Sequence, residues 1–357
     1  MKDAVNKKIQ MGSPWLLTIL LLLLAAGLAF SWRSDRLEPE AAVLESMSQA
    51  VMESVSDEVV YEKWRGEDTG STAPVVVYHG KKYRQRKDIS TLLLIGLDVN
   101  GLEERLEEMS NRQQADFLML LGVDNVHKKG FALHINRDTM TDVMTKDIQG
   151  ASAGRQYMQI CLSHNYGKDE ASSCENTVDA AENLLYNTRI DHYLCTTMDS
   201  VTYLNDAVGG VELVCLADFP GDSGMKTGKK IVLRGPRALT YVRARMGMPD
   251  ETNLSRMERQ QQYLEELRKV FTAKSRDDPG FLFESLYAIS ENMVSDCTIN
   301  ELSDIANAAL NYDFGKILTV KGEDREGGIY TEYYPDEEAL QQQIIELFYE
   351  EMPQEQP

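Results

Sequence analysis

The sequence predicts an α/β protein: an α-β-α sandwich around a central mixed sheet, with an N-terminal transmembrane helix. Three near-continuous apolar runs lie between Thr91 and Ile135, as is typical of strands covered on both faces. From Glu175 to Leu216 helical and strand patterns alternate, which favours helices packed on a sheet. The uncharged segment from Ser13 to Trp32 is long enough to cross a bilayer.

This apolar segment also decides the predicted location. Trp15 and Trp32 flank it as interfacial anchors do, and the lysines before it favour a cytoplasmic amino end. We therefore expect a single-pass protein of the cell membrane whose C-terminal body is extracytoplasmic. The alternative is a cleaved signal peptide, because Gly27-Leu28-Ala29 forms a small-x-small site.

The predicted organisation has five parts. They are a cytoplasmic tail (1–12), a transmembrane signal anchor (13–32), a juxtamembrane helix and linker (33–74), a folded domain (75–320) and an acidic C-terminal tail (321–357). The stretch from Pro39 to Val59 is amphipathic, and it either pairs with another copy or forms a solvated stalk. The tail after Lys321 is acidic, so we expect it to fray.

Within the folded domain, hydrophobic periodicity gives the elements in order. The predicted strands are Val75 to Tyr78, Thr91 to Leu97, Phe117 to Val123, Gly130 to Ile135, His192 to Thr197 and Val211 to Leu216. The predicted helices are Glu175 to Tyr186, Ser200 to Ala207, Asn253 to Lys274, Phe281 to Asn292 and Ile299 to Leu310. Gly209-Gly210 marks the turn between the second helix and the last strand.

One stretch reverses the charge of its surroundings. The chain has a formal net charge of -20, yet positions 226–245 hold seven basic residues and no acid. The acidic balance argues against bulk nucleic-acid binding, which favours a broad basic surface. Grouped guanidinium groups suit a phosphate or pyrophosphate, because each planar fork donates two hydrogen bonds. The alternative is a solvated basic face.

Two neighbouring segments supply these guanidinium groups. Arg243 and Arg245 lie in a stretch that we expect to be a short strand or extended. Arg256, Arg259 and Gln260 fall at i, i+3 and i+4 of the following helix, so they share one face. Together the two segments predict an anion pocket.

Carboxylates stand at the ends of the apolar strands. Asp98 ends the first strand and Asp116 begins the second, and such positions often border a ligand crevice. Two carboxylates near a phosphate suit Mg²⁺, which prefers hard oxygen ligands. Arg137 and Asp138 close the third strand and could reach the same crevice. The alternatives are ordinary turn residues for the aspartates and a surface ion pair for Arg137.

Other common chemistries lack support. The five cysteines show no C-x-x-C spacing, which disfavours zinc. Cys161 and Cys174 either form a loop disulfide in an oxidising compartment or are buried thiols. The sequence has no G-x-S-x-G, no Walker loop and no G-x-G-x-x-G. Common hydrolase and nucleotide-binding types are therefore disfavoured.

Taken in order, these pieces resemble the LytR-CpsA-Psr family of membrane-anchored cell-wall enzymes. The resemblance runs from about Thr91 to Gln262. It rests on the segments LLIGLD (93–98), AD (115–116), INRDT (135–139), DAVGGVE (206–212), ALTYVRAR (238–245) and RMERQQ (256–261). No single motif is decisive, but their order makes the assignment strong.

The resemblance implies a function. Family members transfer a glycopolymer, such as teichoic acid or capsule, from a polyprenyl-pyrophosphate carrier onto peptidoglycan outside the membrane. It implies a magnesium site at Asp98 and Asp116. It also implies a pyrophosphate site built from the residues Arg137, Arg243, Arg245, Arg256 and Gln260. Arg259, Gln114 and Asp138 are counted with the substrate-binding residues.

Three positions depart from the family pattern. Gln114 stands where the family has an arginine, and Asn136 stands in place of the usual proline. Asn253 replaces an aspartate that is often assigned as the catalytic base, and an amide accepts no proton at neutral pH. Two hypotheses follow: a working transferase, or a catalytically weak relative that binds polyprenyl phosphates as a scaffold or regulator of wall assembly.

Overall fold

The computed structural model describes residues 75–97, 114–146, 151–197, 199–245, 247–278, 293–298, 312–327 and 330–353, with isolated helical positions between 281 and 308. The expected membrane anchor, the juxtamembrane helix, Asp98 and most of the two helices predicted between 281 and 310 lie outside the described residues. No helix within the described ranges is long and apolar enough to cross a membrane.

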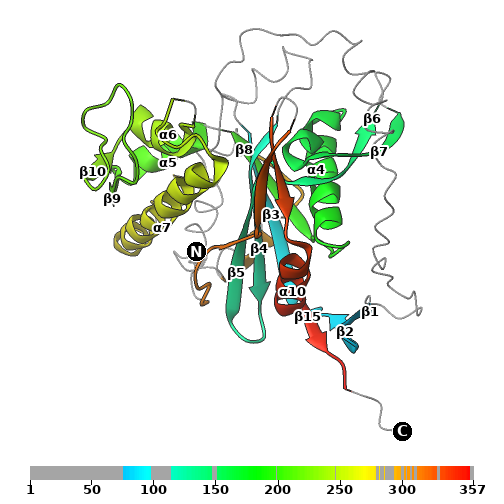
Figure 1. The fold of residues 1–357 in the computed structure, drawn as a ribbon. Coiled ribbons are helices and arrows are strands. Elements are labelled where there is room, and N and C mark those ends of the chain that lie inside the picture. The colour runs from blue at the N-terminus through cyan, green and yellow to red at the C-terminus, as the bar shows by residue number, and fades with distance from the viewer. Residues whose placement is uncertain are drawn as a thin grey trace, which may run out of the picture.

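A six-stranded sheet with the order β11-β8-β3-β4-β5-β12 forms the centre of the described part (Figure 1). Its strands are β3 (Ile89–Leu97), β4 (Ala115–Asp124), β5 (Lys129–Ile135), β8 (His192–Thr197), β11 (Met293–Ser295) and β12 (Leu318–Thr319). β8 runs parallel to β3 and β12 runs parallel to β5, whereas the other pairs are antiparallel. The predicted mixed sheet is therefore confirmed.

Alternate residues of the central strands enter two separate cores, as the apolar runs predict. Leu92 and Leu94 of β3 belong to one cluster, and Leu93 and Ile95 belong to the other. A bulge between Gly96 and Leu97 shifts the β3–β4 register at the end nearest the site described below.

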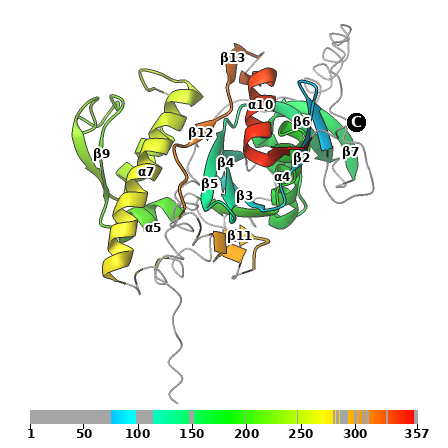
Figure 2. The same ribbon diagram turned by 90° about the horizontal axis from the view of Figure 1, so that it is seen from below.

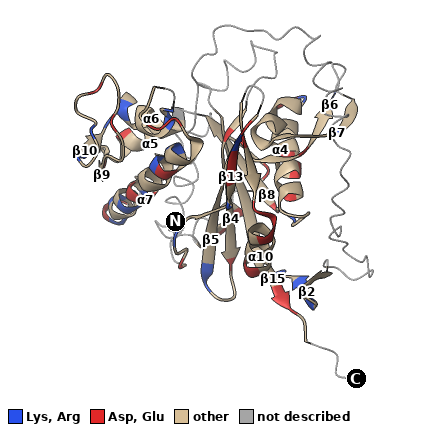
Figure 3. Cartoon of the chain, viewed as in Figure 1, with Lys and Arg blue, Asp and Glu red and all other residues tan. Residues whose placement is uncertain are grey.

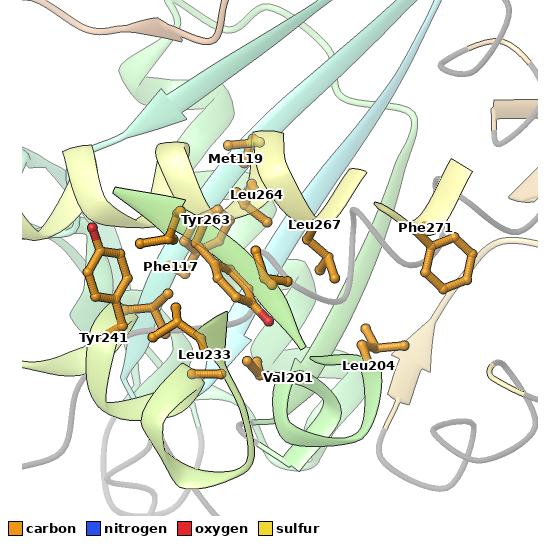
Figure 4. Close-up of a cluster of buried hydrophobic side chains, with 14 of the residues drawn as sticks. Phe117, Met119, Val201, Leu204, Leu233, Tyr241, Tyr263, Leu264, Leu267 and Phe271 are labelled. Carbon is orange, nitrogen blue, oxygen red and sulfur yellow. The ribbon is translucent and has the colours of Figure 1, made fainter. Parts of the chain in front are cut away.

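Helices cover both faces, which makes the described part an α-β-α sandwich (Figure 2). The helices are α4 (Glu170–Leu184), α5 (Asp199–Ala207), α6 (Pro236–Arg243), α7 (Asn253–Asp277) and α10 (Glu337–Phe348). α5, α6 and α7 pack on the first cluster, where Tyr263 of α7 lies beside Phe117 of β4, and Phe271 lies further along α7 near Leu204 of α5 (Figure 4). α4 and α10 pack on the second.

Smaller pairings complete the chain. They are β1 (Val75–Tyr78), β2 (Lys81–Gln85) and β15 (Tyr349–Glu351) in one sheet, β6 (Met140–Lys146) with β7 (Ser152–Gln159), β9 (Val211–Val214) with β10 (Lys230–Leu233), and β13 (Gly322–Glu326) with β14 (Thr331–Pro335). The strands that the sequence-based prediction did not include are β2, β6, β7, β10, β11, β12, β13, β14 and β15.

Two expectations are wrong. The stretch Tyr241–Arg245 is the end of α6 and the turn after it, because Gly235 (φ 51°) and Pro236 start a helix whose Ala238 and Val242 fall on one buried face. The described residues after Lys321 do not fray. Their acids lie outside, but α10 buries an apolar stripe of Leu340, Ile344, Ile345 and Phe348.

Candidate active site

Several predicted site residues meet where β5 ends, β4 begins and α7 begins. Gln114 directly precedes β4 and Asp116 is its second residue, while Arg137 and Asp138 lie two and three residues after the end of β5. Arg245 lies in the turn after α6, and Asn253 and Arg256 lie in the first turn of α7. Figure 3 shows Lys and Arg on α6, α7 and the β9–β10 hairpin, on the same side of the sheet.

Arg137 is the centre of this cluster and is only 8% exposed. Its Nη1 forms an ion pair with Oδ1 of Asp116, and its Nε lies 3.2 Å from Oδ1 of Asp138. Its Nη2 donates to Oε1 of Gln114 and lies 3.2 Å from Sγ of Cys161. Burial lowers the pKa of Arg137, but its neighbouring groups raise the pKa by more than burial lowers it. Arg137 therefore stays a cation. The sequence leaves a surface ion pair as the alternative for Arg137. The structure shows that its ion pairs are buried.

Asp138 links Arg137 to the turn after α6. Its Oδ2 lies 3.6 Å from Nη1 of Arg245, and its Oδ1 accepts a hydrogen bond of 3.3 Å from Nε2 of Gln159. The Arg245 side chain is 19% exposed, and its Nε donates to the Glu251 carbonyl at 2.9 Å. Arg245 thus keeps one edge toward solvent while it is held on the buried carboxylate.

Asn253 connects α7 to the end of β5. Its Nδ2 donates to Oδ1 of Asn136, and its Oδ1 accepts from Nη2 of Arg256. Arg256 is 1% exposed. Burial, and then the charge of Arg137, lower the pKa of Arg256 to about 9. The site therefore carries an excess of buried positive charge, which a bound anion would relieve.

Arg259 and Gln260, predicted to bind substrate, form hydrogen bonds to the end of α6 in this structure. Arg259 donates from Nε to the Tyr241 carbonyl at 3.1 Å and from Nη2 to the Ala244 carbonyl. Gln260 donates from Nε2 to the Val242 carbonyl at 3.2 Å. Both side chains thus bind the carbonyl groups at the end of α6, where a helix leaves its acceptors unpaired. Arg243, the last residue of α6, is half-buried.

The sequence did not identify every member of the cluster. Gln159, at the end of β7, and Cys161, in the 3-10 helix η2 (Ile160–Tyr166), contact Asp138 and Arg137 from elements with no motif. Burial raises the pKa of Cys161 to about 11, so it is a neutral thiol at pH 7. No local signal marks either residue, because only the packing of the β6–β7 hairpin and η2 brings them here.

The C-terminal hairpin borders the same site. The Tyr333 amide donates to the Asp138 carbonyl at 2.8 Å, and Asp324 is paired with Tyr333 across β13 and β14. Asp324 lies on an exposed strand, where partial desolvation and then the charge of Asp138 raise its pKa, while Arg245 lowers it. The segment expected to fray therefore places a carboxylate near the predicted arginines.

Of the two predicted magnesium ligands, only Asp116 is among the described residues. It is 6% exposed and offers a buried carboxylate, the type of donor that Mg²⁺ prefers. Here the positive charge beside it comes from Arg137. The donor type therefore fits a hard cation, and the second predicted ligand, Asp98, lies outside the described ranges.

Comparisons with known proteins agree with this architecture. The polyisoprenyl-teichoic acid–peptidoglycan teichoic acid transferase TagU of Enterococcus faecalis is 31% identical over 234 residues, covering 65% of this chain and 69% of that protein. A crystal structure of a Streptococcus agalactiae protein matches with a TM-score of 0.58 and 17% identity, covering 72% of this chain and 87% of that one. A structure of TagT bound to LI-WTA matches with a TM-score of 0.52 and 18% identity, covering 73% and 90%. These two structures share the fold.

A family model matches residues 51–348, well over half of the chain. That range includes the central sheet, the arginine cluster and the C-terminal hairpin. The protein therefore belongs to the LytR-CpsA-Psr (LytR_cpsA_psr) family.

Proposed function

We propose that this protein is a membrane-anchored phosphotransferase that moves a glycopolymer from a polyprenyl-pyrophosphate carrier onto peptidoglycan. The observation that carries the proposal is the meeting of Arg137, Arg245 and Arg256 around Asp138. The name of the TagU relative, a transferase from polyisoprenyl-teichoic acid to peptidoglycan, supports the same chemistry.

The charge balance of the site suits a pyrophosphate. The guanidinium groups outnumber the carboxylates, since three arginines, of which Arg137 and Arg256 are buried, lie around the two buried aspartates Asp116 and Asp138. Phosphoryl transfer depends mainly on positioning and on neutralising charge at the transferred group. Arg245 is the most exposed of the three arginines. An anion that enters beside it would compensate the positive charge of the buried Arg256.

The proposed reaction is a displacement at phosphorus. A hydroxyl oxygen of peptidoglycan bonds to the phosphorus that carries the glycan, and the bond from that phosphorus to the lipid-phosphate oxygen breaks. Polyprenyl phosphate leaves and the hydroxyl proton is released. Arg137, Arg245 and Arg256 hold the phosphate oxygens while charge shifts to the leaving group.

A magnesium ion at Asp98 and Asp116 is part of the proposal. When bound, it would neutralise charge on the pyrophosphate. The family relationship and the buried carboxylate of Asp116 support this assignment. The proposed location is the outer side of the cell membrane, supported by the apolar segment from Ser13 to Trp32.

The test uses the full chain purified in detergent, with a lipid-pyrophosphate oligosaccharide, Mg²⁺ and peptidoglycan. Released polyprenyl phosphate is measured by chromatography and mass spectrometry. We expect wild-type release, and a loss of about a hundredfold in Arg245→Ala, as when one donor to a developing negative charge is removed. Arg237→Ala is the matched control, because Arg237 pairs with Asp222 on the surface at 2.8 Å.

The second candidate function is a scaffold or regulator that binds polyprenyl phosphates with little turnover. The observation that favours it is Asn253, whose amide bridges Asn136 and Arg256 where the family pattern has an aspartate. Polyprenyl phosphate binding without release, or a low wild-type rate that Asn253→Asp raises, would select this function. If Arg245→Ala left lipid-phosphate binding unchanged, both functions would be refuted.

A further inference from the structure

A second polar cluster lies inside the molecule, in the core between the sheet and α4. It consists of His164, Cys174 and Cys195, which are 3%, 0% and 1% exposed. Their ligand-type atoms all lie within 4.8 Å of one another. None of the three belongs to the arginine cluster described above.

We propose that His164, Cys174 and Cys195 form a buried binding site for a thiolate-preferring metal ion, for which Zn²⁺ is the reference. Imidazole nitrogen and cysteine sulfur are the donors that Zn²⁺ takes in structural sites. The site has three protein ligands, each from a different element: η2, α4 and β8.

The spacing of the donors is close to what the metal requires. Zn–S bonds of about 2.3 Å and Zn–N bonds of about 2.0 Å place tetrahedral ligand atoms about 3.6–3.8 Å apart. Nε2 of His164 lies 3.8 Å from Sγ of Cys174. Because no pair of the three exceeds 4.8 Å, the ligands need to close by at most about 1 Å.

The charge balance is compatible with a metal in this core. Two thiolates, one neutral imidazole and Zn²⁺ sum to zero, so the loaded site places no net charge among the apolar side chains. Cys174 belongs to the same apolar cluster as Leu93 and Ile95 of β3. These apolar surroundings accept the neutral complex, just as they accept the neutral thiols and imidazole of the metal-free site.

The ligands are held in place by neighbouring hydrogen bonds. Nδ2 of Asn176, on α4, donates to the Ser163 carbonyl at 2.7 Å, and Oγ of Ser163 lies 3.2 Å from Oγ1 of Thr177. These bonds tie η2 to α4 next to His164 and Cys174. Cys195 is fixed by the sheet, where it is paired with Ile95 of β3. Such supporting bonds hold metal ligands in a fixed orientation.

A metal here would stabilise more than the core. η2 also carries Cys161, whose amide donates to the Arg137 carbonyl at 3.1 Å. The metal would therefore join α4 and β8 to the short helix that packs under the arginine cluster. Because the site is fully enclosed, the ion enters as the chain folds.

The sequence gives no sign of this site, since the three residues show no zinc-type spacing. A disulfide between Cys174 and Cys195 is the competing state. It requires a sulfur–sulfur distance of about 2.05 Å and would remove both thiolate ligands.

The test uses the full chain purified in detergent without chelators. Elemental mass spectrometry measures bound zinc, and Co²⁺ replacement reports sulfur ligation through a thiolate-to-cobalt charge-transfer band. The variants are Cys174→Ser and Cys195→Ser. The control is Cys215→Ser, which changes an equally buried cysteine (1% exposed) in the core on the opposite face.

We expect about one equivalent of metal and the cobalt band in wild type and Cys215→Ser, and loss of both in the other two variants. Added Zn²⁺ should raise the unfolding temperature of apo wild type and of the apo control only. Metal-free wild type without a cobalt band would overturn the proposal, as would a mass two hydrogens lower from a Cys174–Cys195 disulfide. The wild-type measurements decide the question even if a variant fails to fold.

Discussion

Nδ2 of Asn253 donates a hydrogen bond to Oδ1 of Asn136, so two positions that depart from the family pattern contact each other. Both residues are buried, at 2% and 1% exposure. The same Asn136 oxygen accepts the Asp138 amide at 2.9 Å, which fixes the turn that carries Asp138. The two substitutions therefore form one structural unit that joins α7 to the end of β5.

This contact predicts an energetic coupling. Asn136→Ala and Asn253→Ala should each lower the free energy of unfolding, and the double variant should lose about 1–2 kcal/mol less than their sum, because one hydrogen bond is removed twice. Denaturant unfolding of the four proteins measures the coupling. Asn136→Ala combined with Asn205→Ala, a buried change on α5, should be additive. Additive losses for the first pair would contradict the contact.

Arg259 is predicted to matter for stability. Arg259→Ala removes hydrogen bonds to the carbonyls of Tyr241 and Ala244 and leaves them in a largely buried site, so the free energy of unfolding should fall by about 2–4 kcal/mol. Denaturant unfolding measures this loss. Arg245→Ala, at a partly exposed position, should cost about 1 kcal/mol or less. If both variants lost the same free energy of unfolding, the assignment of Arg259 to the end of α6 and of Arg245 to the ligand would be contradicted.

His134 is predicted to make the fold acid-sensitive. It is buried beside Phe117, and burial, then the charge of Arg256, lower its pKa from 6.5 to about 3. Between these values the unfolded chain binds a proton that the folded chain does not, so stability is lost as pH falls below about 6.5. At pH 5 the loss is about 2 kcal/mol.

His134→Phe should remove that part of the pH dependence, because a phenyl ring keeps the contact with Phe117 and takes up no proton. Unfolding free energies at pH 7 and pH 5 measure the change. His79→Gln is the control, since His79 is exposed. An unchanged difference between the two pH values in His134→Phe would disprove the assignment.

Asp324 is predicted to oppose anion binding. Its carboxylate interacts with Arg245 and Asp138 across the site, so it competes with a ligand for the Arg245 charge. Asp324→Asn should tighten polyprenyl phosphate binding about two- to fivefold at low salt, and less at high salt. Titration calorimetry at two ionic strengths measures the effect. Glu326→Gln, two residues along the same exposed strand, should change little. Weaker binding in Asp324→Asn would reverse the assigned role.

Local patterns predicted the centre of the fold well. The apolar runs of β3, β4 and β5 define strands covered on both faces, and the spacing of α7 places Arg256 on a buried stripe. The stretch Tyr241–Arg245 was misjudged because its alternation of polar and apolar residues fits a strand. The helix start at Gly235-Pro236 and the buried contacts of Ala238 outweigh that local preference.

The sequence by itself determined the mixed sheet between two helical layers, the family, and the concentration of basic residues late in the domain. Each of these features follows from hydrophobic periodicity, from a short motif or from local composition. Only the tertiary structure decided that Arg137 is shared by Asp116, Asp138 and Cys161, and that Arg259 serves the end of α6. It also brought His164, Cys174 and Cys195 together. The physical reason is that these contacts join segments far apart in the chain, so their geometry is set by how the layers pack and by no local spacing.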